Sequence, residues 1–512
     1  MKETEITIKV KLDDNNIPEQ ISWSAPDGGM KDQLSKAILL SFWDSQKKET
    51  LKMDLWTKEM PIDEMKTFVL QTFLSMKQSI SKATGEENLI NLIEDFCKEF
   101  ESVYSFLKVD SAIEKLFIEE KVNFTENKAA LHWQIRDCDS GLYKSLFESF
   151  RKVRSQIESK KIKNIVSIGI GGSFEGPKLL IESLIDPNNS KFNHVFVTGS
   201  DNQEFYDKTA KLDQKETIFI VSSKSMKTVE ILNNFKLAKS WCLKEIDKSK
   251  ILENFFCVTS NPDEARKRGF LDKNLINFDE NIGGRFSIWS EISITTFLES
   301  EEIFKSFLEG GFEADASIRS KNKYKEAIKK LSFIDLWNSN YLNTDNRAVL
   351  SYVWKLRSFS EYIQQLEMES LGKMANENSI FKKTSQTIYG AYGPRAQHSF
   401  FQMLHQGTSN TCLEIILSND SLESNKLPKI QALIQNELFN VPVKNNLDQN
   451  HRINSNISTN LFTIEEVNPF NLGFLISSWE HKIFISSQLL QINPFDQFGV
   501  DEGKNRINKK FF

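Results

Sequence analysis

Short apolar runs alternate with longer amphipathic stretches in the middle of this 512-residue chain. Strands that are each followed by a helix form parallel sheets with helices on both faces. A long amphipathic stretch, 142–161, precedes the first run and is expected to be a helix. The runs expected to be strands begin at Asn164, His194, Thr217 and Asn254, and the series ends near Gly283-Gly-Arg-Phe-Ser287.

A second series of the same kind follows a helical connection. Its candidate strands are Ala348-Val-Leu-Ser-Tyr-Val353, Thr387-Ile-Tyr389 and Thr411-Cys-Leu-Glu-Ile-Ile-Leu417. Polar stretches near 418–426 and 450–460 are expected to be surface loops, and a helix near 474–490 precedes a C-terminal tail.

The pattern predicts an α/β protein with two sub-domains in tandem, residues 118–287 and 288–512. Each is expected to be a mainly parallel sheet between layers of helices, with ligands at the carboxyl ends of strands. Residues 1–117 are expected to be a mostly helical region that packs on the large domain. A strand-like segment, Ile6-Thr-Ile-Lys-Val-Lys-Leu12, precedes its helices.

Composition excludes several classes of protein. A formal net charge of −5 argues against general nucleic-acid affinity. No apolar run is long enough to cross a membrane, and the charged start, Met1-Lys-Glu-Thr, lacks the apolar region of a signal peptide. The five cysteines are far apart and include no CxxC, which indicates free thiols in a reducing cytoplasm. The six histidines lack the spacing of metal ligands, so no metal is expected.

Two strand ends carry groups that suit a phosphate. The turn Gly169-Ile-Gly-Gly-Ser173 fails the dinucleotide fingerprint because position 174 is Phe, and it fails GxSxG because position 175 is Glu. It retains the hydroxyl of Ser173. The next strand end, Ser222-Ser-Lys-Ser-Met-Lys-Thr228, is rich in hydroxyls. Helix starts and hydroxyl groups bind phosphate, although Ser and Thr are also common in ordinary loops.

Three further stretches hold candidate acid–base or charged groups. Gln365 and Glu369 are one helical turn apart, so the carboxylate is either a positioned base or part of a solvated helix face. Arg285 follows two glycines and would form a surface ion pair or stabilise a developing anion. His398 and His405 are expected to share a helix face, as acid–base groups or as core histidines.

The segment Val122 to Arg136 contributes two local predictions. Thr125 could cap a helix that runs from Glu126. His132 lies one turn from Arg136 and is expected to be structural.

Taken together, these stretches resemble the glucose-6-phosphate isomerase family, also called phosphoglucose isomerases. The matching segments run in the family's order over about residues 122–504. They are 123–136, Gly-Ile-Gly-Gly-Ser at 169–173, Ser-Lys-Ser…Thr at 223–228, Gly-Gly-Arg-Phe-Ser at 283–287, Met-Glu-Ser…Gly-Lys at 368–373, Gln-His-Ser-Phe-Phe-Gln…His-Gln-Gly at 397–407 and Phe-Asp-Gln-Phe-Gly-Val…Gly-Lys at 495–504.

The resemblance implies two sugar-isomerase (SIS) sub-domains, a cytoplasmic homodimer and no cofactor. It also implies reversible conversion of glucose 6-phosphate and fructose 6-phosphate through ring opening and a cis-enediol, as in glycolysis and gluconeogenesis. Glu369 resembles the base that moves a proton between C1 and C2, and Arg285 the stabiliser of the enediolate. His398, contributed by the neighbouring subunit, and Lys504 resemble the ring-opening groups. The remaining substrate and phosphate contacts implied are Gly172, Ser173, Ser223, Lys224, Ser225, Thr228, Gln365 and Gln497. Glu367 is expected to be a helix-surface or supporting residue.

The sequence departs from the family at Phe174, where Asp is common, and at Gly390-Ala-Tyr-Gly-Pro-Arg-Ala396, which replaces a glycine-rich loop. Two other functions are compatible with parts of the pattern. A sugar-phosphate sensor would keep the hydroxyl cradle but would need neither Glu369 nor Lys504. An isomerase of another phosphosugar, such as mannose 6-phosphate, would keep both.

Overall fold

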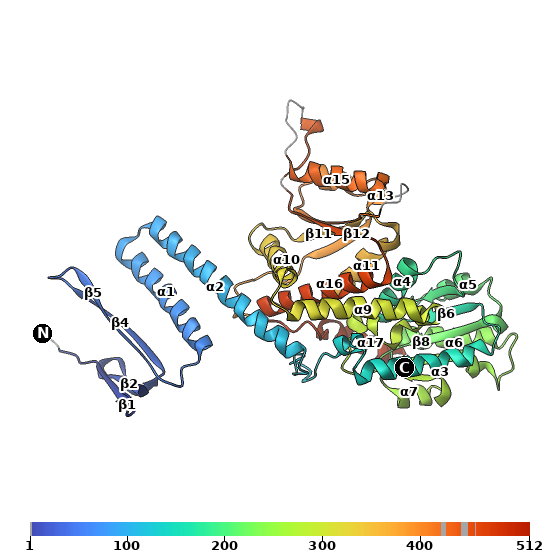
Figure 1. Ribbon diagram of the computed structural model, residues 1–512, viewed down its shortest axis with the longest axis horizontal. Helices are drawn as coiled ribbons and strands as arrows, with labels where there is room; N and C mark the ends of the chain where they lie inside the picture. The colour runs from blue at the N-terminus through green and yellow to red at the C-terminus, as the bar shows by residue number, and fades with distance from the viewer. Residues whose placement is uncertain (1–2, 421–425, 442–448, 456, 512) are drawn as a thin grey trace. The chain divides into compact units, whose positions relative to one another are not determined.

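A computed structural model describes residues 3–420, 426–441, 449–455 and 457–511 (Figure 1). The chain forms two compact units, Met1–Lys108 and Val109–Phe512. Both parallel sheets lie in the second unit.

The first unit contains antiparallel strands and two helices. Three strands form a sheet in the order β1-β2-β3, and β4 pairs with β5 as a hairpin. The elements are β1 (Thr7–Leu12), β2 (Pro18–Ala25), β3 (Met30–Ser35), β4 (Ala37–Asp44), β5 (Glu49–Trp56), α1 (Ile62–Thr84) and α2 (Glu87–Leu116), which continues into the second unit. The expectation of a mostly helical start is therefore wrong for residues 18–56. These strands lack a buried face that would mark them in the sequence; β3, for example, exposes five of its six residues.

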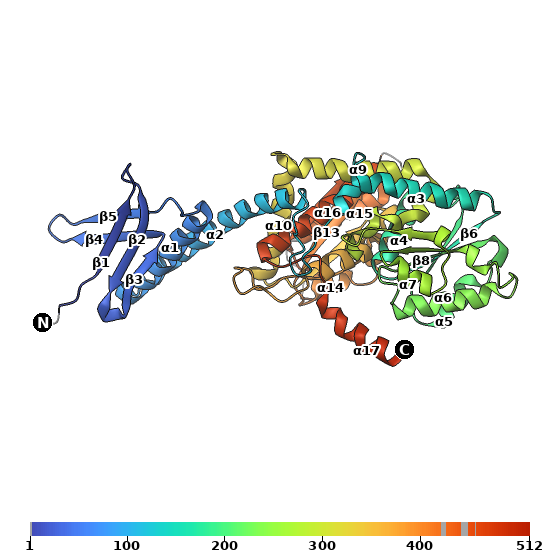
Figure 2. The same cartoon turned by 90° about the horizontal axis from the view of Figure 1, so that it is seen from below.

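The first parallel sheet has the order β10-β9-β8-β6-β7. Its strands are β6 (Asn164–Ile168), β7 (Asn193–Val197), β8 (Thr217–Ser222), β9 (Phe255–Thr259) and β10 (Leu275–Asn277). The side chains of β6, β8, β9 and β10 alternate between two cores, and those of β7 contribute to one of them. On one face lie α3 (Gly141–Glu158) and α4 (Gly172–Leu184); on the other lie α5 (Asn202–Thr209), α6 (Val229–Cys242) and α7 (Pro262–Lys267) (Figure 2).

The strand order reverses at β6, which pairs with both β7 and β8. Ligands of open α/β sheets bind beyond the carboxyl ends of the strands at such a reversal. The glycine-rich turn follows β6 and the hydroxyl-rich segment follows β8, so both predicted phosphate-binding segments lie at this point of the sheet.

The second parallel sheet has the order β12-β11-β13-β14. Its strands are β11 (Asn346–Ser351), β12 (Thr387–Tyr392), β13 (Thr411–Ser418) and β14 (Thr459–Ile464). One face packs on α13 (Gly393–Ala396), α14 (Phe401–Gln406) and α15 (Lys426–Asn440); the other packs on α11 (Phe359–Ile363) and α16 (Pro469–Leu490) (Figure 1). The remaining helices of this unit are α8 (Ile294–Glu299), α9 (Glu301–Arg319), α10 (Lys323–Asn340), α12 (Glu369–Leu371) and α17 (Asp501–Phe511).

The α/β class with two parallel-sheet modules is confirmed, as are the seven predicted strands of the two sheets. The sequence analysis does not predict strands β10 and β14. Two local predictions are wrong. Residues 124–127 form turns instead of a helix capped by Thr125. α14 begins at Phe401, so His398 lies in the preceding turn and does not share a helix face with His405.

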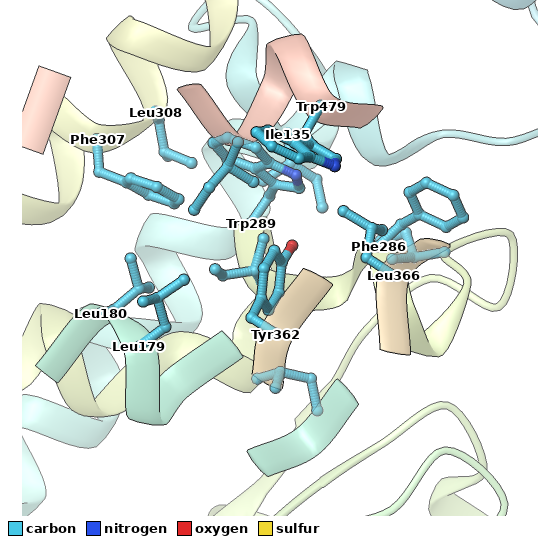
Figure 3. Close-up of a cluster of buried hydrophobic side chains, with 14 of the residues drawn as sticks. Ile135, Leu179, Leu180, Phe286, Trp289, Phe307, Leu308, Tyr362, Leu366 and Trp479 are labelled. Atoms are coloured by element: carbon cyan, nitrogen blue, oxygen red, sulfur yellow. The ribbon is translucent and has the colours of Figure 1, made fainter. Parts of the chain in front are cut away.

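One continuous apolar core joins the two modules. Figure 3 shows Leu179 and Leu180 of α4 facing Tyr362 of α11, with Trp289 between them and Trp479 of α16. The core therefore fixes the helices of the second module against the glycine-rich helix start of the first.

Candidate active site

A cavity of about 1540 Å³ is lined by segments from both sheet modules. The first module contributes Gly171 at the end of β6, and the second contributes Glu369 and the start of β12, Thr387 to Tyr389. The cavity thus lies at the carboxyl end of the first sheet, as predicted, but at the amino end of β12 in the second. Other lining residues include Phe124, Thr125, Glu175, Gln365, Lys373, Asn493, Asp496, Gln497, Phe498 and Lys504.

Glu369 follows a π-helical turn, Gln364–Met368, in the connection between β11 and β12. Turns of this kind are rare and occur often at functional sites. The Gln365 amide donates to Oε2 of Glu369 at 3.1 Å, which confirms that the two side chains share a face. The Glu369 side chain is 27% exposed, so its carboxylate remains accessible from the cavity.

Arg285 provides a fixed cation beside this carboxylate. Its Nε lies 3.2 Å from Oε2 of Glu369. Its terminal nitrogens donate to the carbonyl oxygens of Pro494 and Asp496 and to Oε1 of Gln497, at 2.8 to 3.0 Å. Burial lowers the pKa of Arg285, and the charge of Glu369 opposes that shift. Arg285 is therefore held between Glu369 and residues 494–497, and its burial excludes the surface ion pair considered from the sequence.

The glycine-rich turn allows these groups to meet. Gly171 has a φ of +57°, and a Cβ at this position would lie 2.8 Å from the Gln365 amide nitrogen. A Cβ at Gly172 would lie 1.8 Å from the carbonyl oxygen of Gly284, next to Arg285. A side chain at Gly171 would strain the backbone and displace the Gln365 amide, and a side chain at Gly172 would push away the backbone of the arginine turn.

The predicted phosphate-binding hydroxyls lie at the neighbouring strand end. Ser223 Oγ and Thr228 Oγ1 are 3.5 Å apart, and Ser223 also accepts the N–H of Met226. Thr228 is the N-cap residue of α6, and its side chain makes no capping hydrogen bond. Ser225 accepts the N–H of Lys227. A row of hydroxyls thus precedes one helix start, while Ser173 lies in the first turn of α4.

Other predicted residues are placed in different ways. Gln497 and Lys504 line the cavity, and Lys504 is exposed on α17. Lys224 donates to the carbonyl oxygens of Glu280 and Ile282. His398 is exposed and is not among the residues that line the cavity. Within one chain, the structure therefore brings together Glu369, Arg285, Gln365 and the glycine-rich turn, and leaves His398 apart.

His405 and His132 have structural surroundings. His405 stacks on Phe439 and contacts Oε1 of Gln435 at 3.0 Å. His132 is buried and stacks on Phe286, the residue after Arg285.

The sequence analysis does not identify a polar network that lines part of the cavity. The Asp496 carboxylate accepts from Thr125 Oγ1 at 2.7 Å and pairs with Lys373 Nζ at 2.8 Å, while its carbonyl binds Arg285. Asn493 donates to Thr125 at 2.5 Å. All four residues lie in or next to segments that carry the family resemblance, which is the signal that could have indicated them.

Glu367 is buried, and its carboxylate contacts Arg347, Trp479 and Lys482. The sequence analysis expected Glu367 to be either a helix-surface residue or a supporting residue. Its burial excludes the helix surface.

An α/β protein with a carboxylate and an arginine paired where two parallel sheets meet is suited to proton transfer on a small anionic substrate. This chain belongs to the phosphoglucose isomerase family, whose model matches residues 88–510. Glucose-6-phosphate isomerase from Acinetobacter baylyi is 32% identical over 445 residues, which cover 77% of this chain and 79% of that protein. The enzyme of the same name from Legionella pneumophila (strain Lens) is 33% identical over 457 residues, covering 83% and 87%.

Solved structures are similar to this chain as well. A crystal structure of glucose-6-phosphate isomerase from Chlamydia trachomatis superposes with a TM-score of 0.71 at 26% identity, covering 81% of this chain and 86% of that one. A hypothetical protein from Thermus thermophilus shares the fold, with a TM-score of 0.63 at 20% identity over 80% of this chain and 96% of that one.

A second family model, described as gliding motility-associated protein GldC-like, matches residues 18–105. That range covers most of the first compact unit, including β2 to β5. None of the helices among the described residues is long and apolar enough to cross a membrane.

Proposed function

We propose that this chain interconverts D-glucose 6-phosphate and D-fructose 6-phosphate. The observation that carries the proposal is the Glu369 carboxylate, which faces a cavity while Arg285 and Gln365 hold its Oε2. Membership of the phosphoglucose isomerase family supports the choice of substrate.

Glu369 is proposed as the base. In the open-chain aldose it would take the proton from C2 and return it to C1, and the reverse reaction would use the same carboxylate. The electron pair of the broken C–H bond forms the C1–C2 double bond of the enediolate. Negative charge then develops on the former carbonyl oxygen, O1, and the proton of the C2 hydroxyl passes to O1 as the C2 carbonyl forms.

Arg285 is proposed to stabilise that negative charge. An arginine remains cationic throughout such a reaction, and contacts with Pro494, Asp496 and Gln497 hold it in one orientation. A charge that is fixed before reaction stabilises an anionic transition state without reorganisation during the step.

The phosphate group is proposed to bind the hydroxyls of Ser173, Ser223, Ser225 and Thr228, with Gly172 and Lys224 beside them. These residues follow β6 and β8, where the strand order reverses. Binding energy from this remote group would hold the reacting carbons against Glu369.

Ring opening is proposed to use Lys504 and a His398 supplied by a second copy of the chain. Lys504 lines the cavity, whereas His398 is exposed outside it, which is the placement expected of a residue that serves a partner's site. The proposal therefore includes a homodimer, and a cytoplasmic location accords with the dispersed free cysteines.

Kinetics of the Glu369→Gln variant test the function. The amide keeps the shape of the side chain but cannot accept the proton, so turnover should be lost while substrate still binds. Glu377→Gln, which changes an exposed carboxylate nearby, is the control and should match wild type. Absence of fructose 6-phosphate turnover by folded wild-type protein would reject catalysis. Turnover of mannose 6-phosphate at comparable efficiency would reject strict specificity.

A further inference from the structure

Behind the cavity, five charged side chains form a buried cluster that includes Glu367. Two are cations and three are carboxylates, and the side chains of four are at most 3% exposed, with Asp335 at 9%. The members are Asp335, Arg347, Glu367, Glu414 and Lys482. Burying charged groups costs free energy, so a cluster of this kind contributes little net stability. Its contacts can instead hold a local backbone conformation in place.

Glu367 is the member that belongs to the π-turn. Its carboxylate pairs with Arg347 of β11, accepts the indole N–H of Trp479 at 3.1 Å and lies 3.6 Å from Lys482 Nζ. Trp479 and Lys482 both belong to α16. Glu367 thus connects the π-turn to strand β11 and to helix α16.

Two other contacts hold the same turn against β12, and a third lies within the helical segment itself. The Gln364 amide donates to the carbonyl oxygen of Ile388 at 2.8 Å, and the Ile388 N–H points to the Met368 sulfur at 3.4 Å. Ser370 donates to the carbonyl oxygen of Leu366 at 2.6 Å. Glu367 supplies the charged contact in this set.

The position of Glu369 depends on the shape of this turn. Residues 367 and 369 are two apart, so on a helix they point to nearly opposite sides, one toward the cluster and one toward the cavity. A π-turn contains one more residue than an α-turn. Its relaxation would rotate the following residues by about 100° relative to those before it. Glu369 would then turn away from Arg285, which belongs to the other module.

We infer that Glu367 is a positioning residue: its contacts with Arg347, Trp479 and Lys482 hold the π-turn in the form that directs Glu369 into the cavity. This inference rests on the proposed isomerase function for its kinetic consequence. Its structural consequence, a locked π-turn, does not depend on that function.

Glu414 provides a matched control within the same cluster. Its Oε1 lies 3.3 Å from Arg347 Nη1 and 3.0 Å from Lys482 Nζ, and it is as deeply buried as Glu367. It belongs to β13, which contributes no residue to the cavity lining. Glu367→Gln and Glu414→Gln therefore remove the same charge from the same cations, but only the first acts on the π-turn.

The test compares both variants with wild type by kinetics and by amide hydrogen exchange of residues 364–371. In Glu367→Gln we expect kcat to fall by about 10²-fold with little change in KM, since small misplacements of a catalytic group have effects of this size. The acidic limb of the kcat–pH profile should also move, and exchange of 364–371 should accelerate. Glu414→Gln should keep wild-type kcat, profile and exchange in that segment. If Glu367→Gln fails to fold, Trp479→Phe removes one donor to Glu367, and the same changes are expected in smaller degree.

Equal effects of the two Gln variants would overturn the inference, because the cluster would then act only on stability. A folded Glu367→Gln variant with wild-type kcat and wild-type exchange would also overturn it. If wild type itself shows no turnover, the proposed function fails, and the exchange comparison still decides whether Glu367 locks the turn.

Discussion

The Nε atom of Arg285 lies 3.2 Å from Oε2 of Glu369, and the two residues come from different parallel-sheet modules. The arginine side chain is 1% exposed, whereas that of the glutamate is 27% exposed. The cation is therefore fixed in the protein, and the carboxylate keeps one side open to the cavity. This difference suits a reaction in which the carboxylate moves a proton while the cation stabilises charge without moving.

Replacement of Arg285 by lysine should reduce kcat/KM by about 10²- to 10³-fold, the range found when a fixed electrostatic group is lost. Lysine carries the charge at one point and cannot keep the contacts with Pro494, Asp496 and Gln497 while it faces Glu369. Steady-state kinetics and a thermal melt check this. A folded Arg285→Lys enzyme with near wild-type kcat/KM would contradict the proposed role.

Thr228→Val should raise KM about tenfold or more, the loss expected for a hydrogen bond to a charged group. Because the Thr228 side chain makes no capping hydrogen bond, the change should leave α6 intact. The inhibition constant for inorganic phosphate should rise in parallel with KM, since both report the same site. An unchanged phosphate constant would exclude Thr228 from the phosphate site.

Mixed dimers can test whether His398 serves the partner's site. A chain with His398→Ala keeps Glu369, and a chain with Glu369→Gln keeps His398. If each site takes its glutamate from one chain and its histidine from the other, a heterodimer has one intact site. A mixture refolded at equal concentrations should then recover up to about a quarter of wild-type activity, because half of the dimers are mixed. No recovery, with heterodimers demonstrated by mass spectrometry, would rule out a shared site.

Local pattern was sufficient to predict the strands that are buried on both faces. β6, β8, β9 and β13 have only buried residues, so each reads as a short apolar run. β14 has no buried residue. It is an edge strand whose sequence, Thr-Asn-Leu-Phe-Thr-Ile, contains no continuous apolar run, and it follows an asparagine-rich stretch that resembles a loop. The prediction failed for β14, which has no buried residue, and for β10, which is only three residues long.

In the site, too, local relationships could be predicted from the sequence and long-range contacts could not. Gln365 and Glu369 were paired correctly because their relation is local, one helical turn. The contact between Asp496 and Thr125 spans 371 positions, and no local pattern encodes it. The π-turn could not be predicted from the sequence either. The intrinsic preferences of its own residues do not indicate it, and the contacts that Glu367 makes within it are with Arg347 and Lys482, which lie elsewhere in the chain.

Glu291 is a buried acid outside the proposed reaction. It is 7% exposed and lies at the start of a short helical turn, Glu291–Ser293, in the segment after Arg285. Burial raises its pKa from 4.5 to about 8, and the nearby charge of Asp279 adds to the shift. The folded protein therefore prefers the neutral form of this carboxyl.

The sign of the resulting pH dependence follows from proton binding. Between pH 4.5 and about 8, the folded state holds a proton on Glu291 that the unfolded state has released. Folding stability from this group is fully present below pH 4.5 and declines as the pH rises, by about 1.4 kcal/mol per unit at most. Above about pH 8 the decline ends, since both states are then ionised.

Glu291→Gln should therefore stabilise the protein at pH 8.5 relative to wild type and have little effect at pH 4.5, because the amide cannot ionise. Urea unfolding at both pH values measures the difference between the two free energies of unfolding. Glu313→Gln, which changes an exposed carboxylate on α9, is the control and should show no such pH-dependent gain. If Glu291→Gln changed stability equally at both pH values, the glutamate would be ionised or neutral throughout the range, and the preference for its neutral form would not be the cause.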